Sequence, residues 1–464
     1  MDPDRIAAEI TEERRRRATE GPELWRRFVN PAWAALLHAT GWERRFVRAR
    51  GLELEDDRGD RYLDFLSGFG ALGLGHNHPA LKAALHAALD DDPAGFTQVE
   101  CSGLAGLAAE RLAALVPDGP HRVFFCSSGS EAVEAAIKLA RAATGRRRIV
   151  ACDGAYHGTT LGALSLKGSD AARDRFGPLV PEVTRVAFGD PDALRKTLRR
   201  GDVAAFVVEP ILGEGGAVVP PDDYLRLAAE SVRAEGSLLV VDEVQTGLGR
   251  TGKMFAFEHS GVSPDVVTLA KALGGGLLPV GAMLAKAAPF DRAYGSARTC
   301  MDHATTFGGG PLAMVAVLAT LRILEEERLV ERAREHGLAL RRRLEELASR
   351  HPSIQEVRGL GLMLGLKFRD AARGWLDRTP LAPLGQASAA LLAQSTALRL
   401  LAEHRIVTQA AVNDPAVLKV MPPLTVDEPA IERFVGALDV VLADTNYASA
   451  FVRFSTELLR NTRS

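Results

Sequence analysis

Short apolar runs recur through the middle of the chain, and they alternate with segments whose apolar residues return every three or four positions. Seven such runs stand at 122–126, 148–152, 183–188, 203–208, 238–241, 266–270 and 280–284. Several of them are apolar without alternation, which is typical of strands that are covered on both faces. The order of strands and helices predicts an α/β fold whose large domain carries a mostly parallel, seven-stranded sheet.

The pattern changes near residue 311, where a helical stretch rich in Ala, Leu, Glu and Arg runs to residue 350. Further strands are expected after it, at 354–358, 362–368, 405–409 and 418–420. We therefore predict three parts. Residues 1–65 form an N-terminal helical segment and the start of a small domain, residues 66–330 form the large domain, and residues 331–464 form a smaller α+β C-terminal domain with an appended helix.

Composition excludes several classes of protein. The 464 residues include 57 Lys and Arg against 59 Asp and Glu, so nothing indicates binding to nucleic acid or to an anionic membrane. The longest apolar stretches, such as 312–321, are about half as long as a membrane span must be. Four cysteines, at 101, 126, 152 and 300, match neither a metal-binding spacing nor a disulfide framework, so a cytoplasmic protein without a metal site is expected. The arginines at 14–17 are expected to form a solvated helix face.

The first candidate site follows the run that ends at Cys126. Ser128 and Glu131 have the spacing of a capping box, at the start of a strongly helical segment. A helix N-terminus attracts anions because its free N–H groups and its dipole point at one spot, and here Gly129 allows close approach while Ser130 adds a hydroxyl group. The segment is therefore either an anion site or only a well-capped helix.

Two further runs are followed by an ionisable residue. Asp242 ends one strand, and strand alternation places it on the same face as Val244 and opposite to Glu243. Lys271 ends the next strand and is followed by a glycine-rich turn. A buried lysine has a lowered pKa and becomes a nucleophilic amine that is suited to a Schiff base, although a salt bridge between Lys271 and Asp242 explains both residues as well.

Together the three sites describe one ligand. It needs an anionic phosphate for the helix N-terminus, an electrophilic carbonyl for Lys271 and a cationic group for Asp242. Pyridoxal phosphate has all three, as a phosphate, an aldehyde and a pyridinium nitrogen. The sequence therefore predicts pyridoxal 5'-phosphate as the cofactor of the large domain.

An NAD-dependent oxidoreductase is the rival class of enzyme, because Gly247–Gly252 reads G-x-G-x-x-G after a strand. However, the residues that follow are a poor start for a helix, and Asp265 precedes the next strand instead of ending it. We therefore rank this reading far below the pyridoxal phosphate enzyme.

The chain resembles the class III (omega) aminotransferases, pyridoxal phosphate enzymes of fold type I, over about residues 45–440. The matching stretches are Ser-Gly-Ser-Glu-Ala at 128–132, Tyr-His-Gly at 156–158, Val-Glu-Pro at 208–210 with Gly-Glu-Gly-Gly at 213–216, Val-Asp-Glu-Val-Gln-Thr-Gly at 241–247, Lys-Ala-Leu-Gly-Gly-Gly at 271–276 and Thr-Thr-Phe-Gly-Gly at 305–309. Within the class the chain is most similar to the putrescine (diamine) aminotransferases, through the stretches 29–31, 65–70 and 124–126.

The resemblance implies which residues hold the cofactor. Lys271 would bond to it and shuttle the proton, and Asp242 would pair with its ring nitrogen. The other implied contacts are Ser128, Gly129 and Ser130 at the phosphate, Tyr156 with His157 beside it on the outer ring face, Val244 on the inner face, Gln245 at the ring hydroxyl, and Thr306 at the phosphate of a neighbouring subunit. The family therefore implies a homodimer with active sites at the interface.

The resemblance also implies a transaminase that works by a ping-pong mechanism. An amine donor, with its amino group on a terminal carbon or as an amino acid, would pass that group to a keto acid, ketone or aldehyde. The substrate side of the site would include Phe69, Glu209, Glu214 and Lys419. Aminomutases, decarboxylases and racemases share Lys271 and Asp242 on the same scaffold, so they stay open as alternative reactions.

Three positions depart from the family pattern. Leu212 stands where many members have Gln, and Gly310 where many have Asn. Lys419 replaces the arginine that binds a substrate carboxylate, and lysine cannot grip a carboxylate through two parallel bonds. Glu214, the expected partner of that arginine, would face Lys419. Lys419 therefore either binds a substrate carboxylate or only neutralises Glu214.

Overall fold

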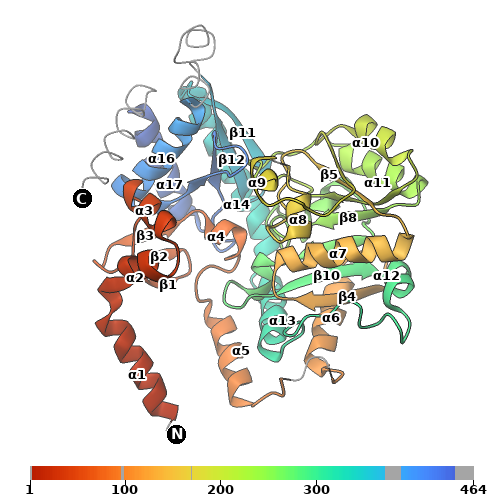
Figure 1. Ribbon diagram of the computed structural model, residues 1–464. Helices are drawn as coiled ribbons and strands as arrows, with labels where there is room; N and C mark the ends of the chain where they lie inside the picture. The colour runs from red at the N-terminus through yellow and green to blue at the C-terminus, as the bar shows by residue number, and fades with distance from the viewer. Residues whose placement is uncertain (1–2, 96–98, 169, 371–387, 445–464) are drawn as a thin grey trace.

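The computed structural model describes residues 3–95, 99–168, 170–370 and 388–444, and its strands form three sheets (Figure 1). The largest sheet has the strand order β4-β10-β9-β8-β7-β5-β6. Its strands are β4 (His121–Cys126), β5 (Arg148–Cys152), β6 (Val183–Val186), β7 (Val203–Val208), β8 (Leu238–Asp242), β9 (Val266–Leu269) and β10 (Gly281–Lys286). Among these strands β10 alone is antiparallel to both neighbours, so the prediction of a mostly parallel seven-stranded sheet is confirmed.

Helices cover both faces of this sheet, which explains why its strands are apolar without alternation. In β8, Leu239 and Val241 pack into one core and Leu238 and Val240 into the other. The first core is closed by α6 (Gly103–Leu115), α10 (Pro191–Leu198), α11 (Tyr224–Ala234) and α13 (Pro311–Glu326), and the second by α7 (Gly129–Thr144), α8 (Leu161–Ser165) and α12 (Ala287–Tyr294). Each fully buried Val or Leu side chain contributes about 1.5–3 kcal/mol. The buried polar residues Asp242 and Thr268 in these strands are hydrogen-bonded to each other.

Two four-stranded sheets lie beside the large one. One has the order β11-β12-β15-β14, with β11 (Ile354–Leu360), β12 (Met363–Phe368), β15 (Val417–Val420) and β14 (Gln409–Ala410). The other has the order β1-β2-β3-β13, with β1 (Phe46–Arg50), β2 (Glu53–Asp56), β3 (Arg61–Asp64) and β13 (Ile406–Val407). The neighbouring helices are α14 (Leu329–Arg350), α16 (Ser388–His404) and α17 (Glu428–Ala443). Since β13 pairs with β3, residues that lie more than 300 positions apart in the sequence share one sheet.

Three details differ from the sequence-based expectations. The strands β1, β2 and β3 were not predicted. The expected strand 405–409 is two strands, because the chain passes from one sheet to the other at Thr408. The helical stretch 311–350 breaks at Arg328, whose φ of 51° is left-handed and ends α13. This break lies next to the proposed domain boundary at residue 330.

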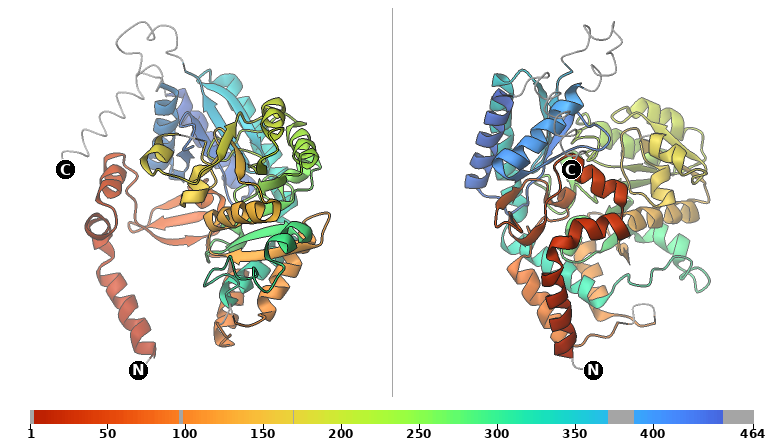
Figure 2. Two further views of the ribbon diagram at one scale, coloured as in Figure 1. Left: turned by 45° about the vertical axis from the view of Figure 1, so that its right-hand side comes forward. Right: turned by 60° about the vertical axis from the view of Figure 1, so that its left-hand side comes forward.

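The N-terminal helices are α1 (Pro3–Arg16), α2 (Gly21–Phe28) and α3 (Pro31–Ala39), followed by α4 (Ser67–Gly70) and α5 (Pro79–Asp90). Helix α1 stands away from the rest of the chain in Figure 1 and in the left view of Figure 2, and Arg14, Arg15 and Arg16 on it are exposed. The appended helix that we predicted for the last twenty residues lies outside the described residues. Among the helices of the described ranges, none combines the length and the hydropathy of a membrane span.

Candidate active site

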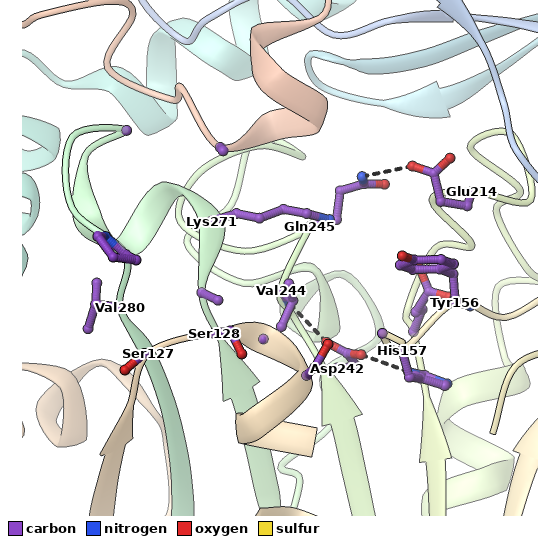
Figure 3. A pocket seen from close by; sticks show the side chains of 18 of the residues that line it. Ser127, Ser128, Tyr156, His157, Glu214, Asp242, Val244, Gln245, Lys271 and Val280 are labelled. Atoms are coloured by element: carbon purple, nitrogen blue, oxygen red, sulfur yellow. Dashed lines mark hydrogen bonds and ion pairs between the residues drawn. The ribbon is translucent and has the colours of Figure 1, made fainter. Parts of the chain in front are cut away.

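A cavity of about 430 Å³ opens where the strands of the large sheet end (Figure 3). Its volume lies in the range of sites for small molecules, about 300–1,000 Å³. Segments that follow β4, β5, β7, β8 and β9 all reach it, as expected for ligands at the carboxyl ends of parallel strands. Eleven predicted site residues line it: Ser128, Gly129, Ser130, Tyr156, His157, Glu209, Glu214, Asp242, Val244, Gln245 and Lys271.

Asp242 is buried at the end of β8 and is fixed by three donors. Its Oδ1 accepts hydrogen bonds from the backbone N–H of Val244 at 3.1 Å and from the hydroxyl group of Thr268 at 2.9 Å. Its Oδ2 lies 2.7 Å from Nδ1 of His157. Burial is the largest single influence and opposes a charged His157 ring, but the hydrogen bond to Asp242 and the charges of Asp242 and Glu209 together raise the pKa of His157. The carboxylate is therefore held in one orientation, with a negative charge facing the cavity.

Lys271 begins a short 3₁₀ turn after β9 and has a φ of 45°. A lysine in this left-handed region is strained, which is common at functional sites. Burial lowers the pKa of Lys271, although the carboxylates of Glu214 and Asp242 act in the opposite direction. A lysine with a lowered pKa is more often neutral, and only the neutral amine attacks a carbonyl.

The N-terminus of α7 forms another wall of the cavity. Ser128 caps the helix, because its hydroxyl group accepts the backbone N–H of Glu131 at 3.2 Å. The Glu131 carboxylate reaches back to the N–H of Ser127, one residue earlier than in the predicted capping box. A Cβ atom at Gly129 would lie 2.9 Å from the Val244 side chain, so only glycine lets this helix start pack against the β8 segment.

Tyr156 and Gln245 face the cavity from two different loops. The backbone N–H of Tyr156 donates to Glu209 at 2.8 Å. Gln245 donates through Nε2 to the carbonyl oxygen of Phe69 at 3.0 Å, and its buried Oε1 has no hydrogen-bond partner in the described part of the chain. The site therefore contains a buried acceptor for which the protein supplies no donor.

Glu209 was expected on the substrate side. Both of its oxygens are occupied by backbone groups, the N–H of Tyr156 and the N–H of Gly213 at 2.9 Å. Burial raises the pKa of Glu209 to about 7. The carboxyl group therefore ties two loops of the cavity wall together instead of presenting a free oxygen to a substrate.

Lys419 and Phe69 lie behind the cavity wall, and neither lines it. The ammonium of Lys419 bonds to both oxygens of Glu214, at 2.8 and 2.9 Å, and stands 4.4 Å from the centre of the Phe69 ring. Only 1% of the Lys419 side chain is exposed. Burial lowers the pKa of Lys419, and its charge in turn lowers the pKa of Glu214 against the effect of burial. The two side chains therefore form a buried ion pair whose carboxylate also borders the cavity.

Thr306 is exposed and does not line the cavity of its own chain. Conversely, Ala71 and the segment Leu277–Val280 do line it, and sequence reasoning missed both. The signal for the second was present, because this segment directly follows the glycine-rich turn after Lys271.

Comparison with known proteins gives one consistent result. A family model described as aminotransferase class-III matches residues 39–442. The chain is 40% identical over 436 residues to a putrescine aminotransferase from Pectobacterium atrosepticum, with 91% of this chain and 88% of that protein aligned. It is 38% identical over 449 residues to the aminotransferase PigE from a Serratia species, which aligns with 90% of this chain. The chain spans about half of PigE, 53% of its length.

Solved structures agree with the sequence relatives. An amine transaminase from an uncultivated Pseudomonas species, solved with pyridoxal phosphate bound, superposes with a TM-score of 0.77 at 30% sequence identity. The match covers 87% of this chain and 95% of that one.

Proposed function

This chain belongs to the class-III aminotransferases, and we propose that it moves an amino group from an amine donor to a keto acid, ketone or aldehyde, with pyridoxal 5'-phosphate as its cofactor. One observation carries the proposal. The N-terminus of α7, the Asp242 carboxylate and the Lys271 amine all face a single cavity, and they complement the phosphate, the ring nitrogen and the carbonyl of this cofactor.

The residues of the cavity fit this cofactor in a further respect. The buried Oε1 of Gln245 lacks a donor among the described residues, and a ring hydroxyl group would supply one. Tyr156 and Val244 come from different loops and would flank the two faces of the ring. Thr306 does not reach this cavity, which leaves its predicted phosphate contact to a neighbouring subunit.

When bound, the cofactor supplies a carbonyl that takes up and returns an amino group and a ring that withdraws electrons from the reacting carbon. Lys271 provides the amine that holds the cofactor and carries the proton between donor and acceptor atoms. Asp242 would keep the ring nitrogen of the bound cofactor charged, and His157 keeps Asp242 oriented. Ser128, Gly129 and Ser130 would hold the phosphate at the start of α7.

We propose that the donor is a terminal amine without a carboxylate at the reacting end. Lys271, which is assigned to the cofactor, is the only Lys or Arg side chain that lines the described cavity wall. Lys419 is committed to Glu214 by two hydrogen bonds. A carboxylate beside the reacting carbon would therefore meet no free cation, and the likeness to a putrescine aminotransferase supports the same class of donor.

The role of Lys419 can be tested by substitution. Lys419→Met should reduce activity with a keto acid and with an uncharged aldehyde acceptor to the same degree. It should also lower the free energy of unfolding by about 3 kcal/mol, because it leaves the Glu214 carboxylate buried without a cationic partner. The measurements are kcat/KM for the two acceptors and a urea unfolding curve.

The matched control removes both charges. Lys419→Met combined with Glu214→Gln should regain most of the lost stability, since no unpaired charge remains. A loss confined to the keto acid would contradict the proposal and would make Lys419 a carboxylate anchor.

We also propose a homodimer whose active sites lie at the interface. Thr306 is exposed, as are the apolar residues Phe307 at 78% and Val99 at 79%. A second copy of the chain that covers this apolar surface would bring Thr306 to the phosphate end of the partner's cavity.

Mixing variants tests this arrangement. Lys271→Ala and Thr306→Ala subunits should each form weakly active or inactive dimers. Exchange between them should restore activity, because each mixed dimer has one site with an intact Lys271 and an intact Thr306. Activity is measured after exchange has been verified by mass spectrometry of tagged subunits. Verified exchange without recovery would place Thr306 outside the partner's site.

A cytoplasmic location is part of the proposal. All four cysteines of the chain are unpaired, and two of them, Cys101 and Cys300, are exposed. Free exposed thiols are usual in a reducing compartment.

A further inference from the structure

The turn between β14 and β15, residues 411–416, projects from the β11-β12-β15-β14 sheet, here called the small-domain sheet, toward the loops of the cavity wall. Asn413 lies at its centre and contacts two loops of the large domain. Its backbone N–H donates to the carbonyl oxygen of Glu214 at 2.9 Å. Its side-chain Nδ2 donates to the carbonyl oxygens of Gly154 at 3.0 Å and Ala155 at 3.3 Å. One residue therefore bonds to the loop that carries Glu214 and to the loop that carries Tyr156.

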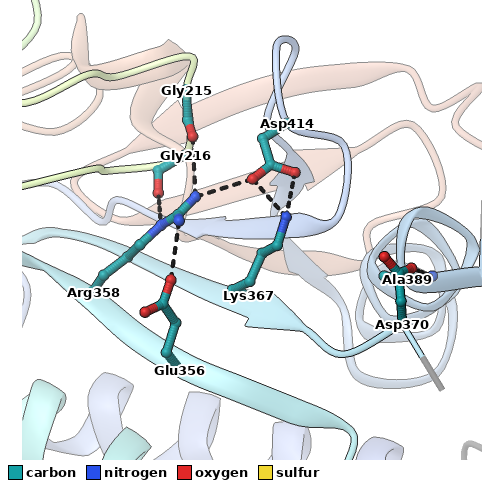
Figure 4. A network of polar contacts seen from close by, with 8 residues as sticks. All are labelled: Gly215, Gly216, Glu356, Arg358, Lys367, Asp370, Ala389 and Asp414. Atoms are coloured by element: carbon teal, nitrogen blue, oxygen red, sulfur yellow. Dashed lines mark hydrogen bonds and ion pairs between the residues drawn. The ribbon is translucent and has the colours of Figure 1, made fainter. Parts of the chain in front are cut away.

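The turn is held in place by a charged cluster beside it (Figure 4). Asp414 accepts hydrogen bonds from Lys367 through both oxygens, at 2.7 Å each, and from Arg358 at 3.2 Å. Arg358 also donates to the carbonyl oxygens of Gly215 at 3.0 Å and Gly216 at 2.6 Å. Through Arg358 on β11 and Lys367 on β12, the small-domain sheet therefore bonds both to the turn and to the loop that follows Glu214.

The same two loops are joined on their inner side. Glu209 accepts one N–H from each loop, as described above, and a Cβ atom at Gly215 would lie 3.5 Å from the carbonyl oxygen of Gly154. The turn also reaches the carboxylate itself, because the N–H of Val412 donates to Oε2 of Glu214 at 3.2 Å. The two loops are therefore fixed between Glu209 on one side and Asn413 on the other.

We propose that Asn413 is a positioning residue that sets Tyr156 and Glu214 relative to each other, and that couples both to the small domain. Asn413 does not line the cavity and acts only through the two loops. The inference rests on the proposed function, in which Tyr156 lies beside the cofactor ring and Glu214 lies at the substrate end of the cavity. The coupling itself is a property of the protein and is measurable without the reaction.

The experiment replaces the amide by a carboxylate. In Asn413→Asp, an oxygen that cannot donate faces the carbonyl groups of Gly154 and Ala155, so the contact becomes repulsive. The matched control is Asn77→Asp, because the Asn77 amide also donates to a backbone carbonyl, that of Ala49 at 2.9 Å, and lies away from the cavity.

Hydrogen–deuterium exchange of the cofactor-loaded protein provides the first readout. In Asn413→Asp, amide exchange should rise by about tenfold in both segments 154–157 and 213–217, while Asn77→Asp leaves them unchanged. Repeating the measurement without pyridoxal phosphate should give the same joint rise. If exchange rises only within 411–416, or in one loop without the other, the coupling is refuted whatever reaction the enzyme catalyses.

Kinetics and circular dichroism provide the second readout. With an amine donor such as putrescine, Asn413→Asp should raise KM about tenfold and change kcat less than about threefold, because Lys271 and Asp242 stay in place. The visible circular dichroism of the bound cofactor should also change, since it reports the placement of Tyr156. A lower melting temperature with unchanged KM and unchanged dichroism would overturn the proposal and leave Asn413 a purely structural residue.

Discussion

Lys271→Ala is expected to abolish turnover with every pair of donor and acceptor. Lys271 is the only lysine that lines the described wall of the cavity, and its lowered pKa favours the reactive neutral amine. The phosphate and ring contacts do not involve this side chain, so the variant should still bind pyridoxal phosphate. Reduction of the wild-type protein with borohydride should fix the cofactor to the peptide that contains Lys271, and mass spectrometry identifies that peptide.

Lys286→Ala is the control for this substitution. Lys286 lies at the opposite end of β10 from the cavity and pairs with Asp265 at 3.3 Å. The Lys286→Ala variant should retain normal turnover, and borohydride reduction should still fix the cofactor at Lys271. Normal turnover by Lys271→Ala, or labelling of another lysine, would remove the chemical basis of the assignment.

Asp242→Asn should lower kcat by about two to three orders of magnitude, because each ~1.4 kcal/mol of lost transition-state stabilisation costs a factor of ten. The amide keeps the size of the side chain and can still accept hydrogen bonds from Val244 and Thr268. The amide lacks the negative charge that, in the proposed function, keeps the ring nitrogen protonated. The effect is measured as kcat with cofactor in excess, so that weaker cofactor binding does not contribute.

The neighbouring acid offers a matched comparison. Glu243 is buried next to Asp242 but points away, where it accepts the Thr246 hydroxyl group and the N–H of Phe257 at 2.9 Å. Glu243→Gln should therefore affect stability more than kcat. If Asp242→Asn keeps its activity within threefold of wild type, the carboxylate does not serve the ring nitrogen.

The strands of the large sheet could be predicted because burial on both faces leaves an apolar pattern within each strand's own sequence. Strands buried on both faces must be apolar throughout, and β5 and β7 begin and end at the residues that the sequence indicates. The strands β1, β2 and β3 were missed because charged residues dominate them. Even a buried position can be acidic there, since Asp56 is satisfied by the N–H groups of Arg58 and Asp60 and by the Tyr62 hydroxyl group.

Much of the cavity was predictable for a related reason. Parallel strands end at one edge of a sheet, so residues that follow different strands, such as Ser128, Asp242 and Lys271, converge without any knowledge of long-range contacts. Asn413 follows no such rule. Its contacts depend on how the small-domain sheet sits against the large domain, and an asparagine in a turn carries no signal of that arrangement.

The pair of Lys419 and Glu214 falls between these cases. The resemblance to the family implied that the two residues face each other and left two roles open, an anchor for a substrate carboxylate or a neutralising partner. The distances of 2.8 and 2.9 Å to both oxygens, together with the burial of Lys419 behind the cavity wall, favour the second role. The preference rests on the depth of burial of Lys419, which depends on packing around β15 and not on residue type.

The most direct test of the account separates the two half-reactions. Wild-type protein loaded with pyridoxal phosphate is mixed with a terminal amine such as putrescine, without an acceptor, and its visible absorption is followed. We expect the visible absorption band of the bound cofactor to disappear as one equivalent of aldehyde product forms per active site. Addition of a carbonyl acceptor alone should then restore the band and release one equivalent of new amine. A band that persists with every donor, or substrate that is consumed without transfer of nitrogen to an acceptor, would contradict an aminotransferase and favour an aminomutase, a decarboxylase or a racemase on the same scaffold.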